Sequence, residues 1–179
     1  GVSRSMLNMY EQGKRKLPGG IYSVFLPGKT KYVALFIDKE QTISITVDST
    51  DLLNKTVTSG SREDQLFREY QKYVAEKGRA WERERTLYSQ ARTKADSLQH
   101  EANYNRLNKE LNDYRENIIR NKPSSMLATV LSAMKEPPLL HSTPKTRNDS
   151  LENYYHYRRH YWDGITFMDE RVIRTPFFL

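Results

Sequence analysis

The strongest constraint on the fold is a long stretch, from residue 62 to residue 121, in which apolar side chains recur every three or four positions. This spacing places them on one face of an α-helix. Two sets follow it: Phe67, Tyr70, Val74, Trp81, Tyr88, Ala91, Ala95, Leu98 and Ala102, then Tyr104, Leu107, Leu111, Tyr114 and Ile118. The second set is out of phase with the first by two residues. One regular helix cannot keep both sets on a single stripe.

A break between residues 92 and 99 accounts for this shift of phase. Asp96 can serve as the N-cap of a second helix, with Gln99 three residues further on, as in a capping box. Ser61 and Asp64 form a similar pair before the first helix. We therefore predict an antiparallel helical hairpin. The alternative is one continuous helix, about 90 Å long at ~1.5 Å per residue.

Three short segments before the helical stretch have the pattern of β-strands. Residues 21–26 and 32–37 are largely apolar, and the first of them ends at Pro27-Gly28, a turn signal. In residues 42–47 apolar and polar side chains alternate, which indicates one buried and one solvated face. The short connections favour an antiparallel meander. Three strands alone need a cover, from the helices or from further strands.

Two shorter helices are predicted after the hairpin. Pro123 suits the first turn of one of them, and Pro137-Pro138 ends it. The other is expected over residues 150–162, with Asn148 or Asp149 as its cap. An extended tail follows this last helix.

The predicted class is α+β: a small antiparallel β-meander followed by a mainly α-helical region with a long antiparallel helical hairpin. We divide the chain into a partial β-domain over residues 1–58 and a helical domain over residues 59–179. We expect the extended tail of the helical domain to lead toward a missing domain, which the resemblance described below implies. Because the chain opens with Gly1 and not with methionine, we also expect sequence upstream of it.

The composition suits solvated helices better than a thick core, since 37% of the residues are hydrophobic and 28% are charged. The 29 basic and 22 acidic side chains give a formal net charge of +7. This excess is spread along the chain, whereas phosphate-binding proteins concentrate it on one face, so nucleic acid is disfavoured as a partner. The lack of cysteine excludes thiolate catalysis, disulfides and cysteine-ligated metals in this segment.

No group of residues in the sequence has the pattern of an active site. His156 and His160 have a spacing that can hold zinc, with Asp163 as a conceivable third ligand. However, Arg158 and Arg159 lie between the two histidines and would repel a cation. We therefore predict no catalytic, cofactor-binding or metal-ligating residues, no cofactor and no enzymatic activity for this segment.

Aromatic residues gather in and after the last predicted helix. Five of them are the candidate protein-contact or core residues: Tyr154, Tyr155, Tyr161, Trp162 and Phe167. Together with the neighbouring arginines they can stack on nucleic-acid bases. They can equally dock a helix by burying large amphipathic rings. Docking is favoured, because in a chain with few aliphatic residues the aromatic residues must supply much of the core.

Several motifs together resemble a known arrangement. They are Leu17-Pro-Gly-Gly-Ile-Tyr22, Asp38-Lys39-Glu40-Gln41, Asp48-Ser-Thr-Asp51 and, as the strongest match, His160-Tyr161-Trp162-Asp163 with Asp169-Glu170-Arg171 and Arg174-Thr175-Pro176. The arrangement is similar to the β-domain and the helical domain of unknown function that precede the redox domain in extracytoplasmic thioredoxin-like or peroxiredoxin-like proteins of Gram-negative bacteria. The redox domain and its two-cysteine motif are absent here, so no catalytic residue of that family is carried over.

The resemblance implies a location in the periplasm or cell envelope, with membrane contact only through a missing N-terminal anchor, as in a lipoprotein. It implies a non-catalytic accessory region of a thiol-disulfide oxidoreductase-like protein, which positions or dimerises a downstream thioredoxin-like domain or binds its substrate. The alternative is a stand-alone module that binds an envelope protein and carries a helical arm. Partners under these hypotheses are the downstream domain, a second copy of the chain or an envelope protein.

Overall fold

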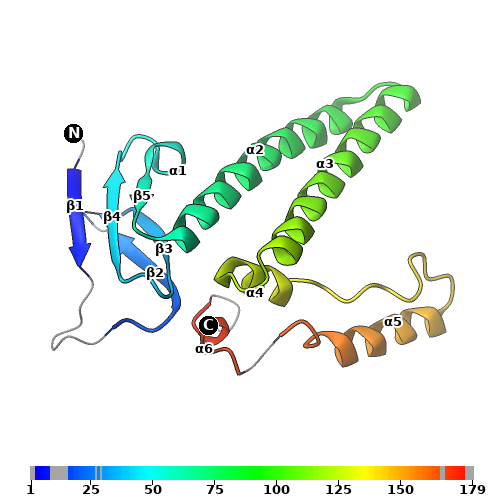
Figure 1. Cartoon of the computed structure of the whole chain (residues 1–179). Helices are drawn as coiled ribbons and strands as arrows, with labels where there is room; N and C mark the ends of the chain where they lie inside the picture. Colours follow the sequence, from blue (N-terminus) through cyan, green and yellow to red (C-terminus); the bar gives the residue numbers. More distant parts are fainter. Residues whose placement is uncertain (1–2, 9–15, 27, 29, 166–167, 176–179) are drawn as a thin grey trace.

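The computed structural model describes residues 3–8, 16–26, 28, 30–165 and 168–175 (Figure 1). Its strands are β1 (Ser3–Asn8), β2 (Gly20–Phe25), β3 (Tyr32–Ile37), β4 (Thr42–Val47) and β5 (Val57–Ser59). Its helices are α1 (Leu52–Lys55), α2 (Arg62–Gln90), α3 (Lys94–Asn121), α4 (Met126–Ala133), α5 (Arg147–His160) and α6 (Glu170–Ile173). The predicted α+β class is confirmed.

The strands form two antiparallel sheets. β4 lies between β1 and β5, and β2 pairs only with β3. The three predicted strands lie within one residue of their predicted positions, but they do not form one continuous meander, because β3 and β4 belong to different sheets. Three further elements before α2 were not predicted: β1, and α1 and β5 between residues 49 and 61.

A buried ion pair from α2 binds the backbone of β3. Asp64 Oδ1 accepts a hydrogen bond from the Phe36 N–H at 3.0 Å, and Arg68 Nη2 donates to the Ala34 carbonyl at 2.9 Å. The two side chains are joined by a bond of 3.0 Å from Arg68 Nε to Asp64 Oδ2. They satisfy backbone groups that a neighbouring strand would otherwise pair with. α2 therefore lies beside β3 where a meander would place β4.

The residues of β3 alternate between two hydrophobic clusters. Leu35 and Ile37 pack with residues of β4, whereas Phe36 belongs to a cluster formed with α2, α3 and α4. The Phe36 ring stacks on Phe67 of α2 at 4.0 Å between centroids. The larger cluster consists of Phe36, Leu66, Ile118, Met126, Leu127, Ala128, Val130 and Leu131. β3 thus joins the β-region to the helices through shared packing.

The predicted helical hairpin is confirmed, and its two helices extend away from the sheets as an arm (Figure 1). Ser61 is the N-cap of α2, as predicted, and accepts a hydrogen bond from the Asp64 N–H at 3.1 Å. The N-cap of α3 is Thr93 and not Asp96, so the second helix begins at Lys94. Asp96 instead occupies the third helical position, where its N–H donates to the Thr93 hydroxyl at 3.1 Å.

The arm is held together by aromatic rings and polar bonds more than by aliphatic packing. Tyr73 contacts Tyr114 at 4.1 Å between ring centroids, and Trp81 contacts Tyr104 at 5.1 Å. Lys77, a charged residue within the first apolar stripe, donates across the seam to Glu110 at 2.6 Å. This cross-helix bond explains why a charge is tolerated at that position.

The described part of the C-terminal tail folds back onto the sheets and contains α6. Arg171 Nη2 lies 2.7 Å from Asp169 Oδ2, and Arg171 Nη1 lies 3.2 Å from Asp38 Oδ2 at the end of β3. The Ile21 N–H of β2 donates to the Arg174 carbonyl at 3.4 Å. Among the described residues, no helix is long and apolar enough to cross a membrane.

Candidate functional site

Helix α5 contains two of the five predicted contact residues, Tyr154 and Tyr155, and begins with a complete capping box. Tyr161 is its C-cap, and Trp162 lies in the turn that follows. Its N-cap is Thr146, and not the predicted Asn148 or Asp149. The Thr146 side chain accepts from the Asp149 N–H at 3.1 Å, and the Asp149 carboxylate accepts from the Thr146 N–H at 3.2 Å. The hydrogen bond from the Thr146 hydroxyl is the main cause of the lowered pKa of Asp149. These reciprocal bonds start the helix at Arg147.

One buried side chain, Asn153, attaches α5 to the segment before it. Its amide Nδ2 donates to the His141 carbonyl at 2.8 Å, and its Oδ1 accepts from the His141 N–H at 2.9 Å. The His141 ring nitrogen Nε2 also lies 2.7 Å from a Glu152 carboxylate oxygen. α5 is thereby fixed by polar bonds to a neighbouring loop, and Asn153 is its only buried residue.

The aromatic side chains of this region are exposed. The exposed fraction is 53% for Tyr154, 61% for Tyr155, 42% for Tyr161 and 47% for Trp162. None of the four belongs to either hydrophobic cluster, which aliphatic residues dominate. The fifth predicted residue, Phe167, lies outside the described residues. Their alternative role, contact with another protein, stays a prediction.

The exposed rings contact one another in two pairs, one on α5 and one at its C-terminal end. Tyr154 and Tyr155 are 5.5 Å apart between centroids, and Tyr161 and Trp162 are 4.8 Å apart in an edge-to-face arrangement. Arg158 lies over the Tyr154 ring at 5.6 Å. We call Tyr154, Tyr155, Tyr161 and Trp162 the aromatic surface of α5. Tyrosine, tryptophan and arginine are enriched in the centres of protein interfaces.

The two histidines considered for metal binding are close together in α5. The rings of His156 and His160 are 4.4 Å apart, and His160 Nδ1 lies 2.6 Å from Asp163 Oδ2. In the described part of the chain, no three histidine or acidic side chains are grouped so that they could hold a metal ion.

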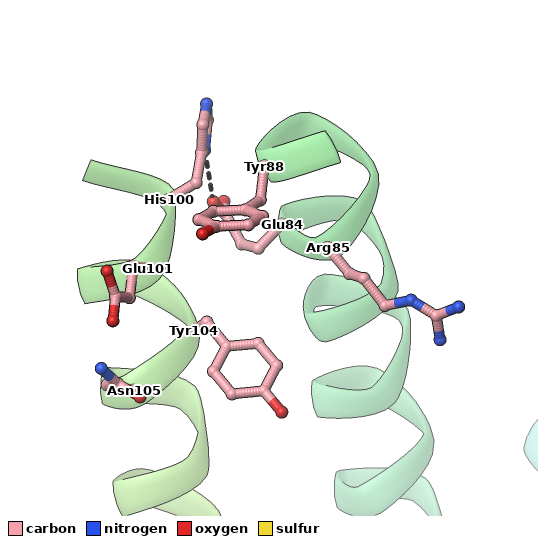
Figure 2. Close-up of a pocket in the computed structure, with 7 residues that line it drawn as sticks. All are labelled: Glu84, Arg85, Tyr88, His100, Glu101, Tyr104 and Asn105. Atoms are coloured by element: carbon pink, nitrogen blue, oxygen red, sulfur yellow. Dashed lines mark hydrogen bonds and ion pairs between the residues drawn. The ribbon is translucent and has the colours of Figure 1, made fainter. Parts of the chain in front are cut away.

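A pocket that the sequence analysis missed lies between α2 and α3 near the distal end of the arm (Figure 2). Its volume is about 270 Å³, and it is lined by Glu84, Arg85, Tyr88, His100, Glu101, Tyr104 and Asn105. We call it the arm pocket. The sequence contains one indication of this pocket: Glu84 and Tyr88 are four residues apart, as are His100 and Tyr104, so each pair lies on one face of its helix. Only the register of α2 against α3 shows that the two pairs lie opposite each other.

Polar bonds hold one carboxylate of the arm pocket in place. His100 Nδ1 lies 2.8 Å from Glu84 Oε2, and Asn103 Nδ2 donates to the same oxygen at 3.2 Å. The hydrogen bond with His100 is the main cause of the lowered pKa of Glu84, followed by the bond from Asn103. Glu84, which interrupts the apolar stripe of α2, therefore finds its partners on α3.

Comparisons with protein-family models, curated proteins and solved structures found no match for this chain.

Proposed function

We propose that this chain is a non-catalytic protein-binding module whose contact surface is the aromatic surface of α5. The observation that carries the proposal is that four large rings, two on a helix with a complete capping box and two at its C-terminal end, are 42–61% exposed. Exposed neighbouring aromatic rings favour a partner that covers them. A helix that is already capped loses less conformational entropy on binding than a disordered segment would.

The family resemblance gives this proposal a specific form. The chain would be an accessory region of a cell-envelope thiol-disulfide oxidoreductase-like protein and would position or dimerise a thioredoxin-like domain or bind its substrate. The alternative is a stand-alone envelope module whose helical arm and α5 recognise another envelope protein. In both forms the chain itself performs no redox chemistry. Purified chain is then expected not to accelerate the reduction of insulin disulfides by dithiothreitol, and clear acceleration would contradict this.

Site-specific photocrosslinking in the native cells tests the contact surface. A benzoylphenylalanine placed at Tyr155 of the native protein is expected to give one defined adduct, which mass spectrometry identifies. Purified chain added in excess should suppress this adduct. Purified chain with Tyr155→Ala and Trp162→Ala should not suppress it, although its circular dichroism should match the unsubstituted chain.

The matched control carries the photocrosslinker at Lys72, an exposed residue on the arm. The same adduct from both positions would show that α5 is not the contact surface. Unfolding of the double variant would also contradict the proposal, because it would assign the rings a role in stability. An adduct within a thioredoxin-like domain supports the accessory form, and an adduct with a different envelope protein supports the stand-alone form.

A further inference from the structure

We propose that the arm pocket binds a lysine or arginine side chain of a protein partner. The inference rests on the proposed protein-binding function and names the chemistry that a second contact point would recognise. Three features support it: aromatic walls, carboxylates without a lysine or arginine partner and a volume suited to one side chain.

The walls of the pocket are two tyrosine rings from opposite helices. Figure 2 shows Tyr88 of α2 and Tyr104 of α3 on either side of the open space, with Glu84 close to Tyr88. The Tyr104 ring also contacts the Trp81 ring of α2, at 5.1 Å between centroids. Tyr88 is 51% exposed, so the pocket is accessible from solvent. Aromatic faces attract ammonium and guanidinium groups through the ring quadrupole.

The charge that the pocket presents is negative. Both hydrogen bonds to Glu84 involve Oε2, and among the described residues Glu84 forms no ion pair with a lysine or arginine. Glu101 forms no ion pair within the described part of the chain and its carboxylate is exposed. Figure 2 shows the Glu101 carboxylate on the side of α3 away from the tyrosine rings, so a cation between the rings would meet the Glu84 carboxylate first, with Glu101 adding negative charge from further away.

The one arginine that lines the pocket does not neutralise it. Arg85 Nη1 lies 3.5 Å from Glu82, and its guanidinium lies over the Trp81 ring at 5.7 Å from the centroid. Figure 2 shows this guanidinium directed away from the space between the tyrosines. Arg85 is thus held on the outer side of α2.

The size of the pocket favours a side chain over a cofactor. Its volume of about 270 Å³ lies just below the ~300–1,000 Å³ of small-molecule sites. A single long side chain can enter between the two helices, while the rest of the partner stays outside the arm. The site would therefore add specificity for a basic residue to the contact made by α5.

Peptide titration of the complete, ¹⁵N-labelled chain tests the proposal. The probes are acetylated and amidated pentapeptides with arginine, lysine or glutamine between paired glycines, added at low ionic strength and followed by two-dimensional NMR. We expect saturable shifts of the amide signals of residues 84–88 and 100–105 with the arginine and lysine peptides. The glutamine peptide should bind at least fivefold more weakly. Equal binding of the glutamine peptide, or no shift at 20 mM peptide, would overturn the proposal.

Two substitutions in the pocket and two matched controls complete the test. Tyr88→Leu, which keeps an apolar wall but removes the ring, and Glu101→Gln should each weaken arginine-peptide binding at least threefold. Tyr32→Leu on β3, an exposed tyrosine outside both proposed contact sites, and Glu76→Gln, an exposed carboxylate elsewhere on the arm, should leave it unchanged. Loss of binding in the controls, or none in the pocket variants, would count against the pocket. Circular dichroism of each variant confirms that it is folded.

This experiment is separate from the test of the α5 surface. If the peptides fail to bind while the crosslink from position 155 persists, only the role of the arm pocket falls. If the crosslink fails while the arginine peptide binds the pocket, the arm is the contact site and the proposed role of α5 falls.

Discussion

At the scale of single residues, the Asp64–Arg68 pair is the most consequential feature. The Asp64 side chain is fully buried and Arg68 is 8% exposed, so water cannot replace the bonds that they make to each other and to β3. The sequence pattern indicates Asp64 only as part of a helix cap. Its side chain in fact bonds to the backbone of Phe36, 28 residues earlier, and only a tertiary contact can reveal this.

Breaking this pair should destabilise the protein strongly. Asp64→Ala leaves the buried Arg68 charge without its carboxylate and the buried Phe36 N–H without an acceptor, so the free energy of unfolding in urea should fall by about 3–5 kcal/mol. The control is Asp113→Ala, which removes an exposed pair with Lys109, and it should cost no more than about 1 kcal/mol. Equal effects of the two substitutions would contradict the role assigned to Asp64.

At the scale of elements, a carboxylate of α2 accepts a hydrogen bond from a backbone N–H at the start of α4. Glu63 lies in the first turn of α2, and its Oε2 accepts a hydrogen bond from the N–H of Met126, the first residue of α4. Burial is the main cause of the raised pKa of Glu63, and the nearby Asp38 carboxylate adds to it. The bond from Met126 lowers the pKa but does not offset the burial. The contact therefore joins the N-terminal turns of α2 and α4, and it requires the partial desolvation of the Glu63 carboxylate.

This raised pKa predicts a pH dependence of stability. A carboxyl whose pKa is higher in the folded than in the unfolded state binds more protons when folded, so stability falls as pH rises from the unfolded pKa through the folded pKa. In Glu63→Gln this fall should be absent, while the amide oxygen can still accept from Met126. The difference in the free energy of unfolding between variant and unsubstituted chain should therefore shift in favour of the variant between pH 4 and pH 7. A difference that does not change with pH would contradict the assignment.

At the scale of the whole molecule, the C-terminal segment ties distant parts of the chain together. Arg171 binds Asp169 and also Asp38, which lies 133 positions earlier in the sequence. Arg171 is the main cause of the lowered pKa of Asp169. The sequence predicted an extended tail here. The described residues 168–175 are instead fastened to the sheets and to α4.

Removing this guanidinium should release the segment. Arg171→Ala is expected to raise the hydrogen-exchange rates of residues 169–175 and of Ile21, while the exchange rates in α2 and α3 stay close to those of the unsubstituted chain. Mass spectrometry after deuterium labelling measures both. Arg174→Ala, which removes the guanidinium bonds to the carboxylate and the backbone carbonyl of Glu170, is the control and should change little. Unchanged exchange around Asp38 and Asp169 in Arg171→Ala would show that other contacts hold the segment.

The sequence by itself determined the kind and approximate bounds of most elements. The period of two predicted β4, the period of three to four predicted α2 and α3, and the phase shift predicted the hairpin, since all these signals are local. The predicted cap of α3, Asp96, lies three residues after the actual cap, Thr93. Both residue types are suitable caps, and the residue pattern does not choose between them.

Only the tertiary structure decided which surfaces meet. β3 lies against α2 and not beside β4, because the buried Asp64–Arg68 pair binds its backbone. The rings in and just after α5 stay exposed, because none of them joins the two hydrophobic clusters that β3, β4, α2, α3 and α4 form. The arm pocket exists because Tyr88 and Tyr104 come into register across the hairpin. Such arrangements depend on contacts between residues far apart in the sequence, and no local periodicity contains them.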